Sequence, residues 1–544
     1  MSQALVLAEN VRFMDREAAA QWGLNPFALV EAAGRTCAAE FVRAFPRLFD
    51  RPSAGERLAA GSTPAVTVLA GSGNNAADAL VMLRALLLWG YVDPAAALVL
   101  MSRLPAEEEE TPLSGAVLAI QKLHVPVTVW DGENLAAPLS EADIIIDGIA
   151  GTGLQGPLRG KLREMVEALN RLREKAGADA CPPARHPLVV SIDLPSGICD
   201  EWRSNMPVLR ADLTLAIEPQ KRCLYTPTLR PQAGKIFSVG GIFPRALIEK
   251  YRDAELLSWQ SAAGRIPRVS ENTYKYERGL VEIRAGAPGT AGAARLAARG
   301  AQAAGAGLIR LIVDDSLYPI LAPEASGVMV VPDGALDGEG RLQPDAALLG
   351  PGWGRGPDRA GLLKQYLPLE EQGVPLILDA DAIYLAKDLR FHGNAIFTPH
   401  AGEFAAYTDL PKEELLADPA PILRRFAKEK NAHILFKGHV LYAAAPDGRL
   451  GIIDGMSPAL AAGGSGDVLA GICAAIAARQ KRVVPVRQEN AAFDGYVSAC
   501  AAAALLIDAA RAVAGRFIDP AELADAVASI AGKAWLAPSW NSHE

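Results

Sequence analysis

The run Gly463, Gly464, Ser465, Gly466 and Asp467 places three glycines and a carboxylate directly before small apolar residues. Because strings of glycine are unfavourable inside a helix, we expect a helix to begin here. The first N–H groups of a helix have no internal partners and carry the positive end of its dipole. Glycines let a ligand approach that backbone closely. The run therefore predicts an anion cradle, with the carboxylate beside the bound anion.

Polar side chains also follow three apolar, strand-like runs in the first half of the chain. They are Asn74, Asn75 and Asp78 after the first run, Asp147 at the end of the second, and Asp193 and Ser196 after the third. Because ligands of parallel sheets collect at the carboxyl ends of strands, we expect these side chains in one region. Their oxygen atoms suit a hard cation, and paired carboxylates permit proton transfer. Capped turns in an ordinary sheet use the same residue types, so the residues alone leave both interpretations open.

The second half of the chain has a comparable series with different residue types. Its strand-like runs end in Gly350, Gly352 and Gly354, in Asp379 and Asp381, in Thr398, His400 and Glu403, and in Lys437 with Gly438. A lone histidine is more often structural, and a lone lysine is usually solvated. Their occurrence after successive strands, ahead of the glycine-rich run, favours one shared site.

The bulk composition restricts the class of protein. The chain has 544 residues, a formal net charge of -8 and an apolar fraction of 50%, which is typical of a soluble protein with two or more domains. The absence of a basic stripe argues against a nucleic-acid partner or a membrane surface. Six cysteines without a CxxC pair favour the cytoplasm and argue against structural zinc. We recognise no signal peptide and no clean membrane span.

Strand-like runs alternate with Ala/Leu-rich helical runs through most of the chain. This alternation predicts the α/β class, with parallel sheets covered by helices on both faces in two three-layer αβα domains. The alternation stops between Phe243 and Gly279, where charges are frequent and no strand is evident. We therefore predict an N-terminal domain over residues 1–245, a linker over 246–270 and a C-terminal domain over 271–540.

The N-terminal motifs "GSGNNAADAL", "DGIAGTGLQGPLRG" and "SIDLPSG" resemble the signatures of the NAD(P)H-hydrate epimerase domain of the YjeF N-terminal type, which is Rossmann-like. The resemblance implies a potassium ion held by Asn75, Asp147 and Ser196. It implies Asp193 as the base at carbon 6 of the hydrated nicotinamide ring. It also implies substrate contacts at Asn74, Asn75, Ala76, Ala77 and Asp78, and at Gly151, Thr152, Gly153, Leu154, Gln155, Gly156 and Pro157.

The motifs "GPGWG", "DADAI", "TPHAGEF", "FKGH" and "GGSGDVLAGI" occur in the order that is typical of the ribokinase-like ADP-dependent NAD(P)H-hydrate dehydratases. The resemblance implies that Asp467 is the base on the accepting hydroxyl. Substrate contacts are implied at Ala293, Gly354 and His400. Contacts to the adenine nucleotide, which would bring Mg²⁺ with its ADP phosphates, are implied at Lys437, Gly438, His439, Val440, Leu441, Gly463, Gly464, Ser465 and Gly466.

Two departures from these families bear on activity. Ala76, Ala77 and Ala79 stand where the epimerase family usually has glycine, and each adds a Cβ where backbone is expected to approach the ligand. The strand before "AGAPG" carries Glu282 and Arg284, where the dehydratase family is more apolar.

Together the resemblances predict a cytoplasmic, homo-oligomeric repair enzyme. It would epimerise R and S NAD(P)H hydrates and dehydrate the S form, at the expense of ADP, to NAD(P)H, AMP and phosphate. Two alternatives stay open at this point: a ribokinase-like kinase of a vitamin precursor, and a nucleotide-binding protein whose epimerase site has decayed.

Overall fold

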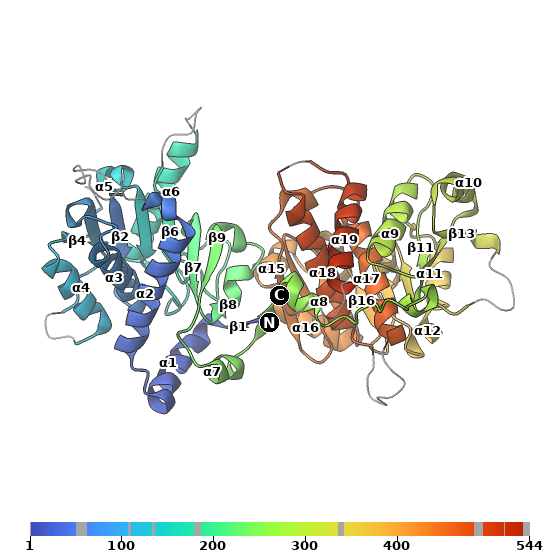
Figure 1. Cartoon of the computed structure of the whole chain (residues 1–544), viewed down its shortest axis with the longest axis horizontal. Coiled ribbons are helices and arrows are strands. Elements are labelled where there is room, and N and C mark those ends of the chain that lie inside the picture. The colour runs from blue at the N-terminus through green and yellow to red at the C-terminus, as the bar shows by residue number, and fades with distance from the viewer. Residues whose placement is uncertain are drawn as a thin grey trace. The chain divides into compact units, whose positions relative to one another are not determined.

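The computed structural model describes residues 2–49, 63–106, 110–132, 136–178, 186–335, 342–483, 493–515 and 517–536. It divides into two compact units, an N-terminal unit of residues 4–253 and a C-terminal unit of residues 254–544 with residues 1–3 (Figure 1).

The N-terminal unit is built on a parallel seven-stranded sheet with the order β4-β3-β2-β5-β6-β7-β9. Its strands are β2 (Val66–Ala70), β3 (Ala97–Met101), β4 (Val127–Val129), β5 (Ile144–Gly148), β6 (Leu188–Ile192), β7 (Leu213–Ile217) and β9 (Lys235–Val239). A short strand β1 (Gln3–Val6) pairs in parallel with β8 (Gln220–Lys221). The strand order reverses between β2 and β5, and ligands bind at such switch points in doubly wound sheets.

Helices cover both faces of this sheet. They are α1 (Ala8–Trp22), α2 (Pro26–Ala44), α3 (Asn74–Leu88), α4 (Pro112–Lys122), α5 (Ala136–Glu141), α6 (Gly160–Ala178) and α7 (Arg245–Lys250). Successive residues of β5 explain the two layers: Ile144 and Ile146 belong to the core under α2 and α3, whereas Ile145 packs in the core under α6. This alternation follows from the period of two in a strand.

The C-terminal unit has a ten-stranded sheet with the order β13-β12-β11-β14-β15-β16-β17-β18-β19-β10. Its strands are β10 (Ala254–Leu256), β11 (Leu280–Arg284), β12 (Leu308–Val313), β13 (Met329–Pro332), β14 (Ala346–Leu349), β15 (Leu376–Leu378), β16 (Ala395–Phe397), β17 (His433–Phe436), β18 (Val440–Ala444) and β19 (Leu450–Asp454). The strands from β13 to β17 are parallel, and β18 pairs antiparallel with β17 and β19.

The helices of the C-terminal unit are α8 (Trp259–Ala263), α9 (Ala291–Ala303), α10 (Tyr318–Leu321), α11 (Pro357–Lys364), α12 (Leu367–Glu371), α13 (Asp381–Leu385), α14 (Ala401–Thr408), α15 (Lys412–Ala417), α16 (Pro419–Lys430), α17 (Ser465–Val483), α18 (Gly495–Ala512) and α19 (Pro520–Trp535). Their small residues serve close packing: a Cβ on Gly471 of α17 would lie 2.0 Å from the carbonyl oxygen of Ala297 on α9. Likewise, a Cβ on Gly300 of α9 would lie 2.3 Å from the carbonyl oxygen of Val468. Helix α18 is long and apolar enough to span a membrane by length and composition, but most of it is buried in this unit, as expected of a core helix.

The stretch predicted as a linker, residues 246–270, has regular structure. Helix α7 extends into it to Lys250, β10 pairs in parallel with β19, and α8 follows. The division between the units falls after Asp253. The many charged residues of this stretch made it look like a linker in the sequence. One of these charges, Glu255 on β10, is in fact buried and bonded to Arg265 and Tyr496.

Candidate functional sites

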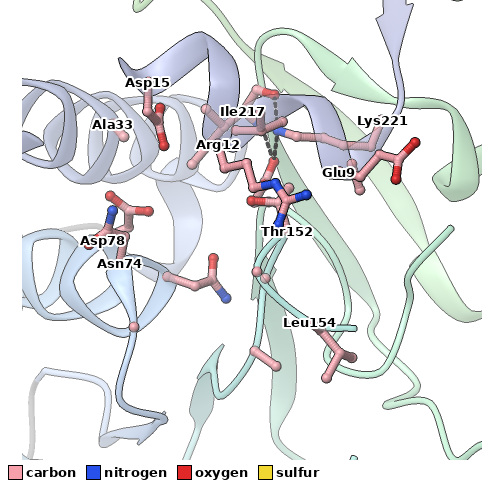
Figure 2. A pocket seen from close by; sticks show the side chains of 18 of the residues that line it. Glu9, Arg12, Asp15, Ala33, Asn74, Asp78, Thr152, Leu154, Ile217 and Lys221 are labelled. Atoms are coloured by element: carbon pink, nitrogen blue, oxygen red, sulfur yellow. Dashed lines mark hydrogen bonds and ion pairs between the residues drawn. The ribbon is translucent and has the colours of Figure 1, made fainter. Parts of the chain in front are cut away.

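A cavity of about 640 Å³ opens in the N-terminal unit at the switch point between β2 and β5. Among the residues predicted to bind substrate, Asn74, Asn75, Asp78, Gly151, Thr152, Gly153, Leu154, Gln155 and Asp193 line it. Figure 2 shows Asp15, Asp78 and Lys221 directed toward this cavity from different elements. The cavity has the size of an ordinary small-molecule site.

Asp193 and Lys221 form a buried ion pair in this cavity. The Nζ of Lys221 donates to Oδ1 of Asp193 at 2.6 Å and to the carbonyl oxygen of Ile217 at 3.0 Å. The Ile217 N–H donates to the same Oδ1 at 3.2 Å. Both contacts to Asp193 use Oδ1, so Oδ2 remains for a ligand. Sequence analysis missed Lys221, although it stands in the polar segment that follows β7.

Two further carboxyl groups face the cavity. Burial, reinforced by the charge of Asp193, raises the pKa of Asp78 well above its usual value. Its Oδ1 is buried and makes no hydrogen bond. Burial also raises the pKa of Asp15 to about 6, although Lys221 acts in the opposite direction. Asp78, whose neutral form burial favours, thus lies in the same cavity as the paired carboxylate of Asp193.

Asp147 on β5, Ser196 after β6 and Asn75 in the first turn of α3 lie close together at the switch point. Oδ1 of Asp147 accepts from the Ser196 hydroxyl at 2.5 Å, and Oδ2 accepts from the Ser196 N–H at 2.9 Å. Ser191 donates to Oδ2 at 2.7 Å. Asn75 packs against Gly151, where a Cβ would lie 2.9 Å from the amide carbon. Its Nδ2 is buried without a hydrogen-bond partner.

The alanines that replace family glycines do not obstruct the cavity. Ala76, Ala77 and Ala79 belong to helix α3 and are buried in the core of the unit, so their conformation is one that alanine favours. A Cβ on Gly148 would lie 2.6 Å from the Cβ of Ala79, so the glycine of β5 accommodates the larger residue. Predicted contacts at Ala76, Ala77, Gly156 and Pro157 lie outside the cavity lining.

In the C-terminal unit, Asp467 lies in the first turn of α17, as the glycine-rich run predicts. Burial raises its pKa to about 6, with Asp379 and Glu403 adding to the shift and Lys437 opposing it. Lys437 Nζ donates to Oδ1 of Asp379 at 2.6 Å, and the Thr398 hydroxyl donates to the same oxygen at 2.7 Å. The ends of β15, β16 and β17 and the start of α17 thus meet at one site. The sequence places Asp379, Thr398 and Glu403 after strand-like runs, but it indicates no catalytic or binding role for them.

The glycine-rich turns surround this site with backbone. Gly464 has φ +99°. A Cβ on Gly466 would lie 3.3 Å from the Nζ of Lys437, which places that lysine beside the helix entrance. Gly352 packs against Thr290 and Ala293: a Cβ on Gly352 would lie 2.7 Å from the Cβ of Thr290 and 3.0 Å from the Cβ of Ala293.

Two other predicted positions differ in what they offer. His400 is the N-cap of α14, and its Nδ1 accepts from the N–H groups of Gly402 and Glu403 at 3.0 and 3.1 Å. His400 therefore caps this helix through Nδ1, and its side chain is also exposed. Its Nε2 takes no part in the capping bonds. The Gly354 N–H donates to Asp381 at 2.8 Å.

The remaining predicted nucleotide contacts vary in exposure. Val440 and Leu441 are buried in β18, and that strand pairs on both sides. Gly438 and His439 are exposed at the turn before it. Within the part of the chain that the structure describes, no group of three His, Cys, Asp or Glu side chains could hold a metal by itself.

One unit holds an open cavity lined by carboxyl groups and a lysine, and the other holds an anion cradle beside Asp467. Together they define a two-site enzyme. A family model described as YjeF-related protein N-terminus matches residues 26–223, and one described as NAD(P)H-hydrate dehydratase matches residues 281–530. The chain is similar to proteins described as bifunctional NAD(P)H-hydrate repair enzyme Nnr. The one from Moorella thermoacetica is 30% identical over 87% of this chain and 88% of the relative. The one from Escherichia coli K12 is 28% identical over 94% of this chain and 90% of the relative.

Among solved structures, the chain resembles the ADP/ATP-dependent NAD(P)H-hydrate dehydratase from Bacillus subtilis, co-crystallized with ATP/Mg²⁺. That match has 23% identity and a TM-score of 0.44, and it covers 51% of this chain and 97% of that one. The chain belongs to the family of bifunctional NAD(P)H-hydrate repair enzymes, with an epimerase half and a dehydratase half. The predicted α/β fold class and enzyme class are confirmed, and the kinase alternative is set aside.

Proposed function

We propose that the two units act in series on hydrated NADH and NADPH, with the residue roles given below. The observation that carries this proposal is that each unit holds its own buried carboxylate beside a lysine. Asp193 pairs with Lys221 at 2.6 Å. In the other unit the buried Asp379 pairs with Lys437 at 2.6 Å, and the charge of Lys437 also acts on Asp467. Two separate acid–base sites fit two consecutive reactions on one substrate.

In the epimerase unit, Asp193 takes the proton from carbon 6 through Oδ2, and a second group returns a proton to the opposite face of the ring, so that the configuration inverts. Lys221 keeps that carboxylate oriented by their 2.6 Å contact. Asp78, whose pKa is raised by burial, supplies the proton donor in the same cavity. Two carboxyl groups in different surroundings can divide the base and acid roles.

We infer a potassium ion beside Asn75, Asp147 and Ser196. The buried Asn75 amide without a partner on Nδ2 supports this, because turning the amide would present its oxygen to a cation. Asp147 is a fully buried carboxylate that, within the described residues, accepts hydrogen bonds from serine hydroxyls and backbone N–H groups, and oxygen donors of this kind suit a hard cation. Replacing K⁺ by Na⁺ should slow epimerisation and leave dehydration unchanged.

In the dehydratase unit, Asp467 accepts the proton of the 6-hydroxyl group as that oxygen attacks the terminal phosphorus of ADP. The bond from that phosphorus to the bridging oxygen breaks, and AMP leaves. Phosphate then departs from carbon 6 with its electron pair, and loss of a proton from carbon 5 restores the ring double bond. The first N–H groups of α17 and the charge of Lys437 stabilise the phosphoryl group in transfer.

Magnesium would enter with the nucleotide phosphates. Three carboxylates, Asp379, Glu403 and Asp467, act on one another around the single cation of Lys437. This excess of negative charge fits a divalent ion, which proteins usually bind through one or two carboxylates together with substrate phosphates. The bound ion would neutralise charge on the transferred group.

Recovery of NADPH from a mixture of R and S hydrate, with ADP and Mg²⁺, tests the proposal. Wild type should recover all NADPH faster than spontaneous epimerisation allows. Asp193→Asn should stall at the S fraction, and Asp467→Asn should recover none. Full recovery by Asp193→Asn at the wild-type rate would contradict the epimerase assignment, and binding of the hydrate without turnover would favour the binding-protein alternative.

We also infer a cytoplasmic location and a homo-oligomer. The five described cysteines are free and buried, which supports a reducing compartment. Cell fractionation and the native mass in solution would test the two points.

A further inference from the structure

A second cavity, of about 370 Å³, lies in the C-terminal unit away from the catalytic site. It is lined by Arg268, Val269, Ser270, Thr273, Tyr274, Tyr276, Glu277, Arg278, Arg479 and Arg482. Arg479 is twelve residues beyond Asp467 on α17, which separates them by about 18 Å along the helix. The segment 268–278 precedes β11, so the cavity faces the amino ends of the strands rather than their carboxyl ends.

The cavity is strongly cationic. Four arginines and one carboxylate, Glu277, are among the described residues that line it. Glu277 accepts from the Tyr274 N–H, and Arg482 pairs with Asp345 at 2.8 Å. The guanidinium of Arg278 donates through Nε to the Gly305 carbonyl oxygen at 2.9 Å, which leaves its Nη atoms for a ligand.

Arg479 is the unusual member of this cluster. Its side chain is only 2% exposed, and its Nε and Nη2 are buried without any hydrogen-bond partner. The guanidinium lies over the Trp535 ring, 3.9 Å from the centroid. Burial and the charge of Arg278 lower the pKa of Arg479 to about 9. Among the described residues, no carboxylate pairs with Arg479. A buried cation without an anionic partner is costly, and a bound anion would remove that cost.

Arg278 and Arg479 converge. A Cβ on Gly305 would lie 3.4 Å from Nη2 of Arg278 and 3.9 Å from Nη1 of Arg479. Guanidinium groups at such proximity suit an anion with several oxygens, because each can bind phosphate through two parallel hydrogen bonds. Tyr274 and Tyr276 are exposed at the rim, where aromatic rings can stack on a base.

We propose that this cavity is a non-catalytic binding site for a diphosphate, either free pyrophosphate or the diphosphate of a nucleotide. Arg479 and Arg278 bind its oxygens, and Arg268 attracts it at the rim. The site is independent of the roles assigned to Asp193 and Asp467.

Titration of pyrophosphate into the full chain, without magnesium, tests this site by calorimetry. Wild type should bind at two places, the arginine cavity and the catalytic cradle, and Lys437→Met should lose only the second. Arg268→Gln with Arg278→Gln should weaken the first by at least about tenfold, the scale of one lost charged hydrogen bond. The control Arg43→Gln removes an exposed positive charge from the N-terminal unit and should leave both pyrophosphate-binding events unchanged.

An unchanged titration in the double arginine variant overturns the proposal, as does the lack of any site that survives Lys437→Met. Thermal unfolding in the Lys437→Met background gives a second measurement. Pyrophosphate should raise Tm there, and Arg479→Gln should abolish the rise; a rise that persists in Arg479→Gln also overturns the proposal. Tighter binding of guanosine diphosphate than of pyrophosphate, lost in Tyr274→Ala, would identify a nucleotide as the source.

Discussion

Asp467 combines two features that phosphoryl transfer requires of a base: it lies in the first turn of α17 at the anion cradle, and partial burial raises its pKa to about 6. Asp467→Asn keeps the shape of the side chain and removes its proton affinity. We expect kcat for dehydration to fall by roughly 10²–10⁴, measured with pure S hydrate. Asp193→Asn is the matched control, and it should dehydrate S hydrate normally.

The pH dependence of dehydration follows from the pKa of Asp467, about 6. The base is active when deprotonated, so kcat/KM should be constant above this pKa and fall as the pH is lowered through 6. Because the pKa is raised from 3.8, the loss should begin well above the pH at which an exposed aspartate protonates. A profile that is flat down to pH 4.5 would exclude Asp467 as the titrating base.

Lys221 is the strongest test of the epimerase cavity. Lys221→Met leaves Asp193 with the Ile217 N–H as its remaining donor at Oδ1, so the carboxylate loses its counter-charge in a buried place. We expect epimerisation to fall at least about tenfold, because the carboxylate is no longer held in place by a charged hydrogen bond. The rate of conversion of R hydrate measures this change. Glu17→Gln, which removes the carboxylate partner of the exposed Lys250, should leave that rate unchanged.

Residue-level reasoning from sequence placed Asp467, Asp193 and Asn75 correctly at strand or helix ends, because glycine and aspartate mark those ends. It could not find Lys221 or Asp15, since a lysine and an aspartate in charged segments look like surface residues until the fold buries them. For the alanines of α3 the sequence suggested interference with the ligand, but in the structure these side chains pack in the core of the unit.

At the scale of elements, β11 shows how a central strand carries charge. Glu282 accepts from Arg310 at 2.8 Å and from the Tyr366 hydroxyl at 2.5 Å, and Arg284 donates to Tyr366 at 2.6 Å and to Asp333 at 2.5 Å. Each charge that departs from the family pattern is therefore neutralised by its own partner, Glu282 by Arg310 and Arg284 by Asp333. Sequence analysis could not anticipate this, because the partners lie on three other segments.

Removing one residue of this network should destabilise the protein, because its charged partner is then left buried and unpaired. Glu282→Ala leaves Arg310 without its buried partner, and we expect a loss of about 3–5 kcal/mol in the free energy of unfolding, measured by urea denaturation. Glu167→Ala removes a half-exposed i,i+4 partner of Arg163 on α6 and should cost less than about 1 kcal/mol. Equal costs for the two variants would mean that the β11 network is not energetically coupled.

At the scale of the whole molecule, the two sites belong to separate compact units and need share only a diffusing substrate. A mixture of Asp193→Asn chains and Asp467→Asn chains should therefore recover all NADPH from mixed hydrates, although each variant alone fails. The rate should rise with the concentration of either variant. Stalling of the mixture at the S fraction would mean that both sites must be intact in one chain.

Asp193 has φ +64°, a left-handed conformation that asparagine and aspartate adopt far more readily than other residues with side chains. Most substitutions at this position would therefore strain the backbone. Asparagine would keep the backbone conformation and remove the negative charge. A lineage could thus silence the first reaction by one conservative exchange and retain a stable chain whose second reaction persists. Such descendants would be recognised by asparagine at this single position within an otherwise intact cavity.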